Sequence, residues 1–66
     1  MIAYDKLWIT MKEKGISTYR LRESHHFNTT TIRSLRHNLN VSTSTLNRLC
    51  TILDCRLEDI AEYIKD

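Results

Sequence analysis

One apolar spacing occurs three times in this short chain. Each time, apolar side chains stand at positions i, i+3, i+4 and i+7, which places them in a single stripe along an α-helix. The three sets are Tyr4, Leu7, Trp8 and Met11; Leu46, Leu49, Cys50 and Leu53; and Leu57, Ile60, Ala61 and Ile64. None of these helices is long enough to be stable alone, so we expect them to share one core.

The composition agrees with a small helical domain. The chain has 66 residues, of which 41% are hydrophobic, with one glycine and no proline. This length suits a single domain over residues 1–66, and the scarcity of turn formers disfavours strands joined by tight hairpins. No run approaches the roughly 18 apolar residues of a membrane span, and no signal peptide is recognisable. We therefore expect no membrane association and a cytoplasmic location.

Two further helices are predicted between the first and second stripes. Gly15 is suited to end the first helix, because glycine accepts the left-handed conformation of many helix ends. The hydroxyl or amide oxygens of Ser17, Asn28 and Ser42 are suited to cap the second, third and fourth helices. Residues 37–41 lack an apolar stripe and are expected to form a loop. The sequence thus predicts a compact all-α fold of five helices.

Residues 17–37 have the layout of a helix-turn-helix, a short helix followed by a tight turn and a second helix. Together with the opening Tyr4-x-Lys6-Leu7-Trp8, they resemble the Cro/CI-type (XRE-like) helix-turn-helix family, and within it a compact subgroup with that opening. The resemblance runs from about Tyr4 to about Tyr63. It implies a lambda-repressor-like DNA-binding domain whose second and third helices form the motif, in a transcriptional regulator of bacterial or mobile-element type.

The resemblance also implies how the motif is held together. Apolar residues should fix the angle between the two motif helices, namely Leu21, Phe27, Ile32 and Leu35. Two positions depart from the wider family. His26 stands in the turn where glycine is usual, and Arg22 stands in the second helix where many members have a small residue. A histidine accepts a left-handed conformation at some cost, so the turn is expected to differ in shape or flexibility from that of the wider family.

A helix over residues 28–38 would then enter the major groove of double-stranded DNA. Arg33 is the best candidate base reader, because its planar guanidinium matches the two acceptors of guanine. Thr18 occupies a position that commonly contacts phosphate in the family, and basic or polar residues near the loop favour the DNA backbone. The candidate DNA-binding residues are Thr18, Arg20, Asn28, Thr29, Thr30, Arg33, Ser34, Arg36, His37 and Asn38.

Charge is distributed unevenly along the chain. Residues 17–40 contain four arginines and a single acidic residue, whereas residues 54–66 contain five acidic residues and two basic ones. A basic segment on a balanced domain is typical of phosphate contact, although four arginines are equally compatible with a solvated helix face. Non-specific DNA binding is a further possibility, which similar affinity for all sequences would reveal.

Specific recognition by so small a domain usually needs two copies on related half-sites. We expect any homodimer to form through the predicted helix over residues 57–64, around Tyr63 and Ile64. The alternative is a protein-interaction module, such as an antitoxin-like accessory subunit, that uses the same fold. Nothing in the sequence indicates catalysis or a cofactor. The histidines and the cysteines Cys50 and Cys55 show no recognised metal-ligand spacing, and packing is the expected role of both cysteines.

Overall fold

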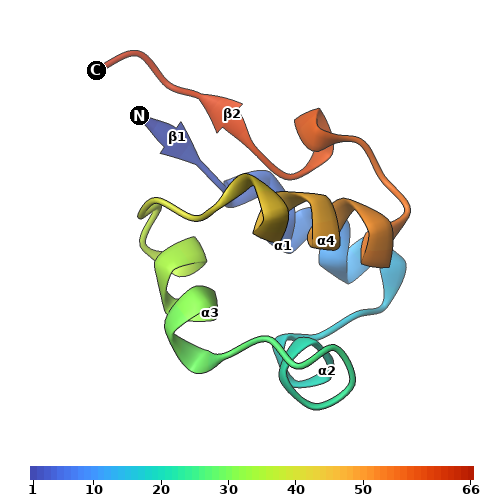
Figure 1. The fold of residues 1–66 in the computed structure, drawn as a ribbon. Helices are drawn as coiled ribbons and strands as arrows, with labels where there is room; N and C mark the ends of the chain where they lie inside the picture. The colour runs from blue at the N-terminus through green and yellow to red at the C-terminus, as the bar shows by residue number, and fades with distance from the viewer.

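The computed structural model describes all residues from Met1 to Asp66 and contains four α-helices and a small sheet (Figure 1). In chain order the elements are β1 (Ile2–Ala3), α1 (Asp5–Lys14), α2 (Thr18–Glu23), α3 (Thr29–Arg36), α4 (Thr43–Leu53), the 3₁₀ helix η1 (Leu57–Asp59) and β2 (Glu62–Tyr63). The four α-helices agree with the first four helices predicted from the sequence. No helix combines the length and the apolar character needed to cross a membrane.

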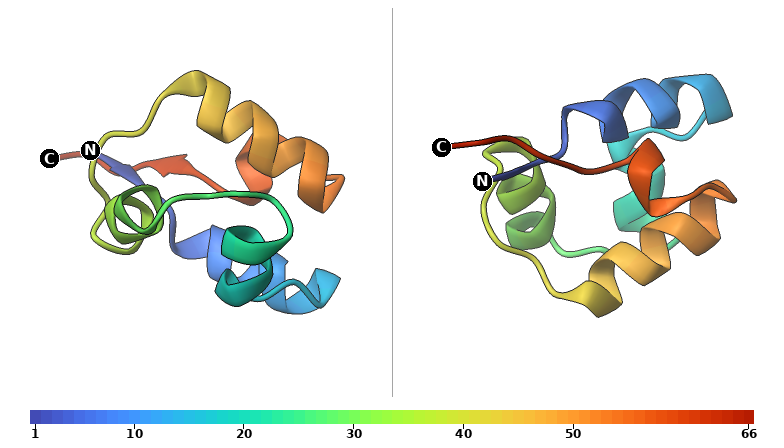
Figure 2. Two further views of the ribbon diagram at one scale, coloured as in Figure 1. Left: turned by 60° about the horizontal axis from the view of Figure 1, so that its bottom comes forward. Right: turned by 90° about the horizontal axis from the view of Figure 1, so that it is seen from above.

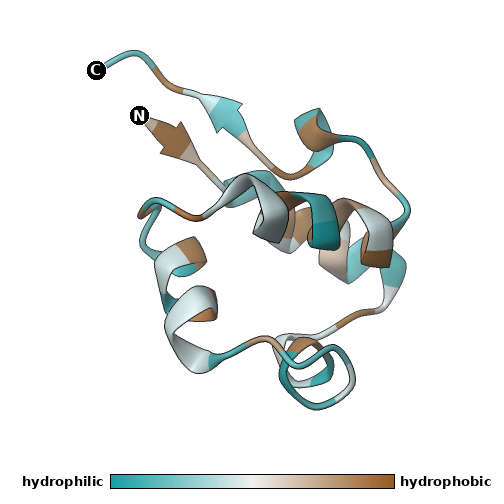
Figure 3. Ribbon diagram, in the orientation of Figure 1, coloured by the Kyte–Doolittle hydropathy of each residue, from teal (hydrophilic) through white to brown (hydrophobic).

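The core receives side chains from α1, α2, α3 and α4, from Phe27 in the turn between α2 and α3, and from Ile60 directly after η1. α1, α4 and η1 pack against one another, and α2 and α3 close the opposite side (Figures 1 and 2). Apolar bands of α2, α3 and α4 are directed toward the centre of the molecule (Figure 3). The side chains with almost no exposed surface are Leu7, Leu21, Leu35, Leu49, Leu53 and Ile60. The short helices therefore stabilise one another through a shared core, as their length requires.

Each predicted side-chain cap is present at its helix start. The side-chain oxygens of Ser17, Asn28 and Ser42 accept hydrogen bonds from the backbone N–H groups of the residues three positions later, at 3.2, 2.7 and 3.1 Å. These bonds satisfy N–H groups that have no partner within the helix. Local sequence therefore sets where α2, α3 and α4 begin.

Three helices end in the same way. Gly15, Asn38 and Asp54 follow α1, α3 and α4 with φ values of 71°, 55° and 48°, in the left-handed region. In each case the next N–H bonds the carbonyl five residues earlier, at 2.9 Å for Ile16, 2.8 Å for Leu39 and 3.1 Å for Cys55. This is the Schellman arrangement. It ends α3 at Arg36, two residues before the predicted end at Asn38.

The prediction of an α-helix over residues 57–64 is wrong. After η1 the chain becomes extended and forms β2, so the fold is not all-α and has four α-helices rather than five. The Thr10 hydroxyl of α1 donates to the carbonyl of Asp59 at 2.6 Å and so holds the end of η1 against α1. Beyond it, Glu62 and Tyr63 pair with Ala3 and Ile2 of β1, which favours an extended chain over a helix.

The two strands pair antiparallel at the ends of the chain. Ile2 lies opposite Tyr63, and Ala3 lies opposite Glu62. Ala3 is fully buried against the core, whereas Ile2 and Tyr63 are exposed. The paired strands β1 and β2, called the β1–β2 ribbon below, bring the two termini side by side, away from α2 (Figures 1 and 2).

Candidate nucleic-acid interface

α2 and α3 are held at a fixed angle by buried apolar side chains. Leu21, Phe27, Ile32 and Leu35 expose 0%, 4%, 6% and 0% of their surface. These are the four residues predicted to fix the motif, and all four are buried in the core. They pack one side of α3 against the body of the protein and leave its other side in solvent.

The turn between α2 and α3 contains a residue in the left-handed conformation. His26 has a φ of 59°, and the following N–H, of Phe27, donates to the carbonyl of Leu21 at 3.0 Å. Arg48 of α4 supports the turn, because its guanidinium lies 4.3 Å from the centre of the Phe27 ring and donates to the carbonyl of His25. The histidine at the usual glycine position is therefore accommodated, with α4 bracing the turn.

The outward side of α3 is short and polar. Thr29, Thr30, Arg33 and His37 are exposed, and Ser34 is half-buried. Asn28 is exposed at the start of this helix, where its side-chain oxygen caps the Thr31 N–H. Small side chains at the first turn allow close approach of a helix to another surface, and the longer Arg33 reaches beyond them.

A shallow groove of about 300 Å³ runs between α2 and α3. α2 contributes residues one turn apart, and α3 contributes residues at i, i+3, i+4 and i+7. The lining residues are Thr18, Arg22, Thr29, Ile32, Arg33 and Arg36. The guanidinium of Arg36 crosses the groove and donates to the hydroxyl of Thr18 at 3.4 Å. Three positive charges therefore line one concave strip of surface.

No carboxylate is paired with these arginines. The ion pairs of the chain lie elsewhere, between the Met1 amino group and Asp66, between Lys6 and Glu62, and between Arg56 and Glu58. All three groove arginines are exposed. Guanidinium groups with open N–H donors and no internal counter-charge are suited to bind phosphate oxygens.

A known protein family and a solved structure resemble this chain in sequence and in fold. Residues 6–66 match the family model of the Cro/C1-type HTH DNA-binding domain. The chain belongs to this family. Its fold is also similar to the crystal structure of the transcriptional regulator VanUg, with a TM-score of 0.88 and 31% sequence identity over 98% of this chain and 87% of that one. No curated protein matches the chain in sequence.

Two of the predicted interface residues lie apart from the groove of this Cro/C1-type domain. Arg20 is exposed on α2, but two helical positions separate it from Thr18 and from Arg22. That separation turns a side chain by about 200°, toward the opposite side of the helix. The side-chain oxygen of Asn38 accepts a bond from the backbone N–H of Tyr4 at 2.8 Å. Asn38 therefore has a structural role, whereas the other predicted residues lie on the outer side of α3 or along the groove.

Arg22 lines the groove but was absent from the predicted DNA-binding residues. It stands four residues after Thr18, and that spacing places two side chains on the same side of a helix. The same rule relates Thr29 to Arg33. Helical spacing is thus the sequence signal that identifies Arg22. From the sequence, this residue was noted only as a departure from the small residue of other family members.

The two cysteines lie away from this surface, where α4 meets η1. Both are free thiols and half-buried, and both pack against the core. Burial raises the pKa of the Cys55 thiol, and neighbouring Cys50 and Asp59 raise it further. A raised pKa keeps the thiol protonated and weakly reactive, which agrees with the packing role expected from the sequence.

Proposed function

We propose that this protein is a sequence-specific transcriptional regulator that reads operator DNA with α3 in the major groove. The observation that carries the proposal is the row of uncompensated arginines along the α2–α3 groove, beside a short polar helix face. Binding to chromosomal DNA would take place in the cytoplasm.

The proposed contacts divide into two groups. Arg33 reads a guanine with its planar fork, while Thr29 and Thr30 approach base edges or a thymine methyl. Asn28 keeps its amide N–H donors for the DNA, since only its oxygen is used by the cap. Thr18, Arg22, Arg36 and His37 contact phosphate and sugar, which sets the position of α3 and supplies affinity but carries no base information.

We propose that two copies bind half-sites about one DNA turn apart. With no C-terminal helix present, the self-contact is assigned to the outer face of the β1–β2 ribbon. Tyr63 is 69% exposed there, and its partner in the sheet, Ile2, is 43% exposed. Light scattering of the free protein and of its DNA complex tests this assignment. A protein that is monomeric in both would contradict it, and a Tyr63→Lys variant should reduce dimer formation while α3 stays intact.

Fluorescence anisotropy on DNA from upstream of the gene tests the main proposal. A scrambled duplex of equal length serves as the control, and both are titrated at several salt concentrations. We expect tight binding to the upstream DNA with a steep dependence on salt. Equal, weak binding to both duplexes, followed by failure to select any sequence from a random pool, would contradict sequence-specific recognition.

A second candidate function is docking to a protein as an accessory subunit. It is favoured by an apolar groove next to the ribbon, lined by Ile2, Leu57, Glu58, Ala61, Glu62 and Tyr63. The proposed DNA contacts and this groove involve different residues, so the two functions can be separated by mutation. Replacing Thr29 and Arg33 with alanine should abolish DNA binding in the regulator and leave partner binding intact in the accessory subunit.

A further inference from the structure

Arg36 is held by residues from two other helices. Its guanidinium carbon lies 5.5 Å from the centre of the Trp8 ring on α1, within the range of a cation–π contact. Its Nη2 donates to the Thr18 hydroxyl on α2. A single side chain of α3 therefore touches both α1 and α2. Trp8 is the only tryptophan of the chain and lies outside the helix-turn-helix.

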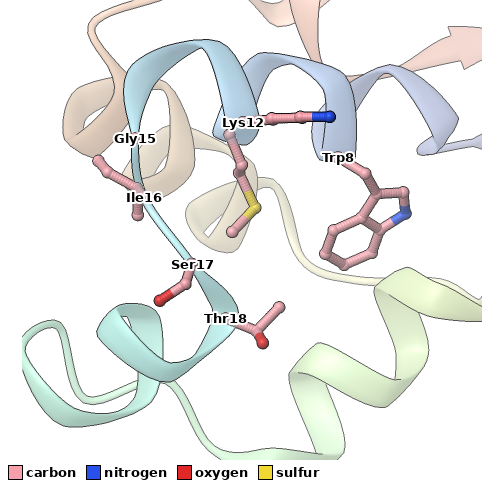
Figure 4. A pocket seen from close by; sticks show the side chains of 7 residues that line it. Trp8, Lys12, Gly15, Ile16, Ser17 and Thr18 are labelled. Atoms are coloured by element: carbon pink, nitrogen blue, oxygen red, sulfur yellow. The ribbon is translucent and has the colours of Figure 1, made fainter.

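The indole is itself supported. Trp8 is half-buried and packs against the core, and it lines an apolar groove of about 410 Å³ between α1 and α2. Figure 4 shows its ring extending from α1 toward the faint green ribbon of α3, with Thr18 at the start of α2. A ring anchored in this way offers a fixed platform, whereas a free arginine side chain samples many rotamers.

The geometry leaves the guanidinium available to a ligand. The indole of Trp8 has no hydrogen-bond acceptor of the ordinary kind, so the ring lies beside the guanidinium without pairing with its N–H donors. One donor is engaged by Thr18 over a long distance of 3.4 Å, and no carboxylate is paired with the group. The other arginines of the groove lack comparable support. Arg22 lies 6.0 Å from the ring of Tyr19, which is itself 62% exposed.

We infer that Trp8 is a positioning residue for DNA binding, which holds Arg36 beside Thr18 as a preformed clamp for one backbone phosphate. This inference rests on the proposed DNA-binding function and adds a residue that does not itself touch DNA. Preorganisation raises affinity because less side-chain freedom is lost when the complex forms. The clamp also ties α1 to the recognition helix, so that α1 contributes to affinity.

A double-mutant cycle tests the inference. Operator affinity is measured by anisotropy for the wild type, Trp8→Leu, Arg36→Ala and the double variant, with Trp8→Phe as the conservative control. We expect Arg36→Ala to reduce the salt slope by about one, as loss of one phosphate contact does. Trp8→Leu should weaken binding about 2- to 5-fold when Arg36 is present and cause no further loss when it is absent. Trp8→Phe should retain most of the affinity.

The outcomes separate the two proposals. A wild-type protein that selects no DNA sequence contradicts the proposed function itself. A wild type that binds its operator, combined with equal effects of Trp8→Leu in both backgrounds, overturns the clamp and leaves Trp8 as a packing residue.

A second measurement remains usable if Trp8→Leu does not fold. Because Trp8 is the only tryptophan, its emission spectrum reports on the contact directly. Arg36→Ala should change the emission of the free protein, whereas the matched variant Arg33→Ala should not. Unchanged emission in Arg36→Ala would overturn the inference.

Discussion

The side-chain oxygen of Asn38 accepts a hydrogen bond from the backbone N–H of Tyr4, a residue 34 positions earlier. Asn38 also has the left-handed backbone that ends α3, with a φ of 55°. One residue therefore ends α3 and fastens that end to the start of α1. Since Tyr4 is almost fully buried, the position of α3 is tied directly to the core.

Asn38→Ala should reduce the free energy of unfolding by about 1–3 kcal/mol, because the Tyr4 N–H loses its partner and alanine tolerates the left-handed region poorly. Asn38→Asp is the matched control, since it keeps both the acceptor and the tolerance of a positive φ. Urea unfolding measures both. If Asn38→Ala were as stable as the wild type, the bond to Tyr4 would contribute nothing to the fold.

The free energy of unfolding of His26→Gly should stay within about 1 kcal/mol of the wild-type value, because relief of the left-handed strain is offset by greater freedom of the unfolded chain. His26→Val should lose about 1–2 kcal/mol, since a β-branched residue is least suited to a positive φ. Chemical denaturation of the two variants gives the comparison. Equal stabilities would mean that the turn does not require φ near its observed 59°.

Leu35→Ala should lose roughly 2–5 kcal/mol, the usual cost of emptying a fully buried leucine site. Leu35 exposes none of its surface. Thr30→Ala, on the exposed side of the same helix, should change stability by no more than about 0.5 kcal/mol. Thermal unfolding followed by circular dichroism distinguishes them, and similar midpoints for both variants would disprove the orientation of α3.

Arg33→Ala should cost about 1–3 kcal/mol of discrimination at one base pair, if its guanidinium reads a guanine. Arg20→Ala removes the same charge from a side chain outside the groove, so it should weaken all DNA sequences alike and lower the salt slope by at most about one. Competition titrations with single-base operator variants measure the difference. An unchanged base preference in Arg33→Ala would assign base reading to another residue.

Cys55 should make stability depend on alkaline pH. Its thiol pKa is raised above the ordinary value of 9.0 by burial, so folding favours the protonated form. The resulting stabilisation is fully present below pH 9 and is lost as the pH rises through the raised pKa. The decrease in the free energy of unfolding from neutral to alkaline pH should therefore be smaller in Cys55→Ala than in the wild type. An identical decline in both would show that the thiol is not perturbed.

Local signals were sufficient for most of the helical fold. Ser17, Asn28 and Ser42 cap helices through bonds to residues three positions away, so each start is determined within a few residues of sequence. Gly15 acts equally locally at the end of α1. The apolar residues of the motif were predictable for a similar reason, since helical spacing separates the buried side of α3 from the exposed side.

The features missed from the sequence depend on distant contacts. Leu57 and Ile60 have helical spacing, but the Thr10 hydroxyl and the pairing with β1 favour an extended chain after η1. The bond from Tyr4 to Asn38 and the contact between Trp8 and Arg36 also join separate elements. No local pattern distinguishes such residues from surface ones, because each acquires its role only when the helices assemble.

The pairing of β1 with β2 has a consequence for synthesis of the protein. Residues 2 and 3 are synthesised before their partners, residues 62 and 63, which are added some sixty codons later. The apolar stripe of α1 is likewise covered only after α4 and η1 have been synthesised. We therefore expect the domain to close only after residues 62 and 63 have left the ribosome. A nascent chain that stalls early would remain open to proteases, so incomplete copies would be degraded before they could occupy DNA.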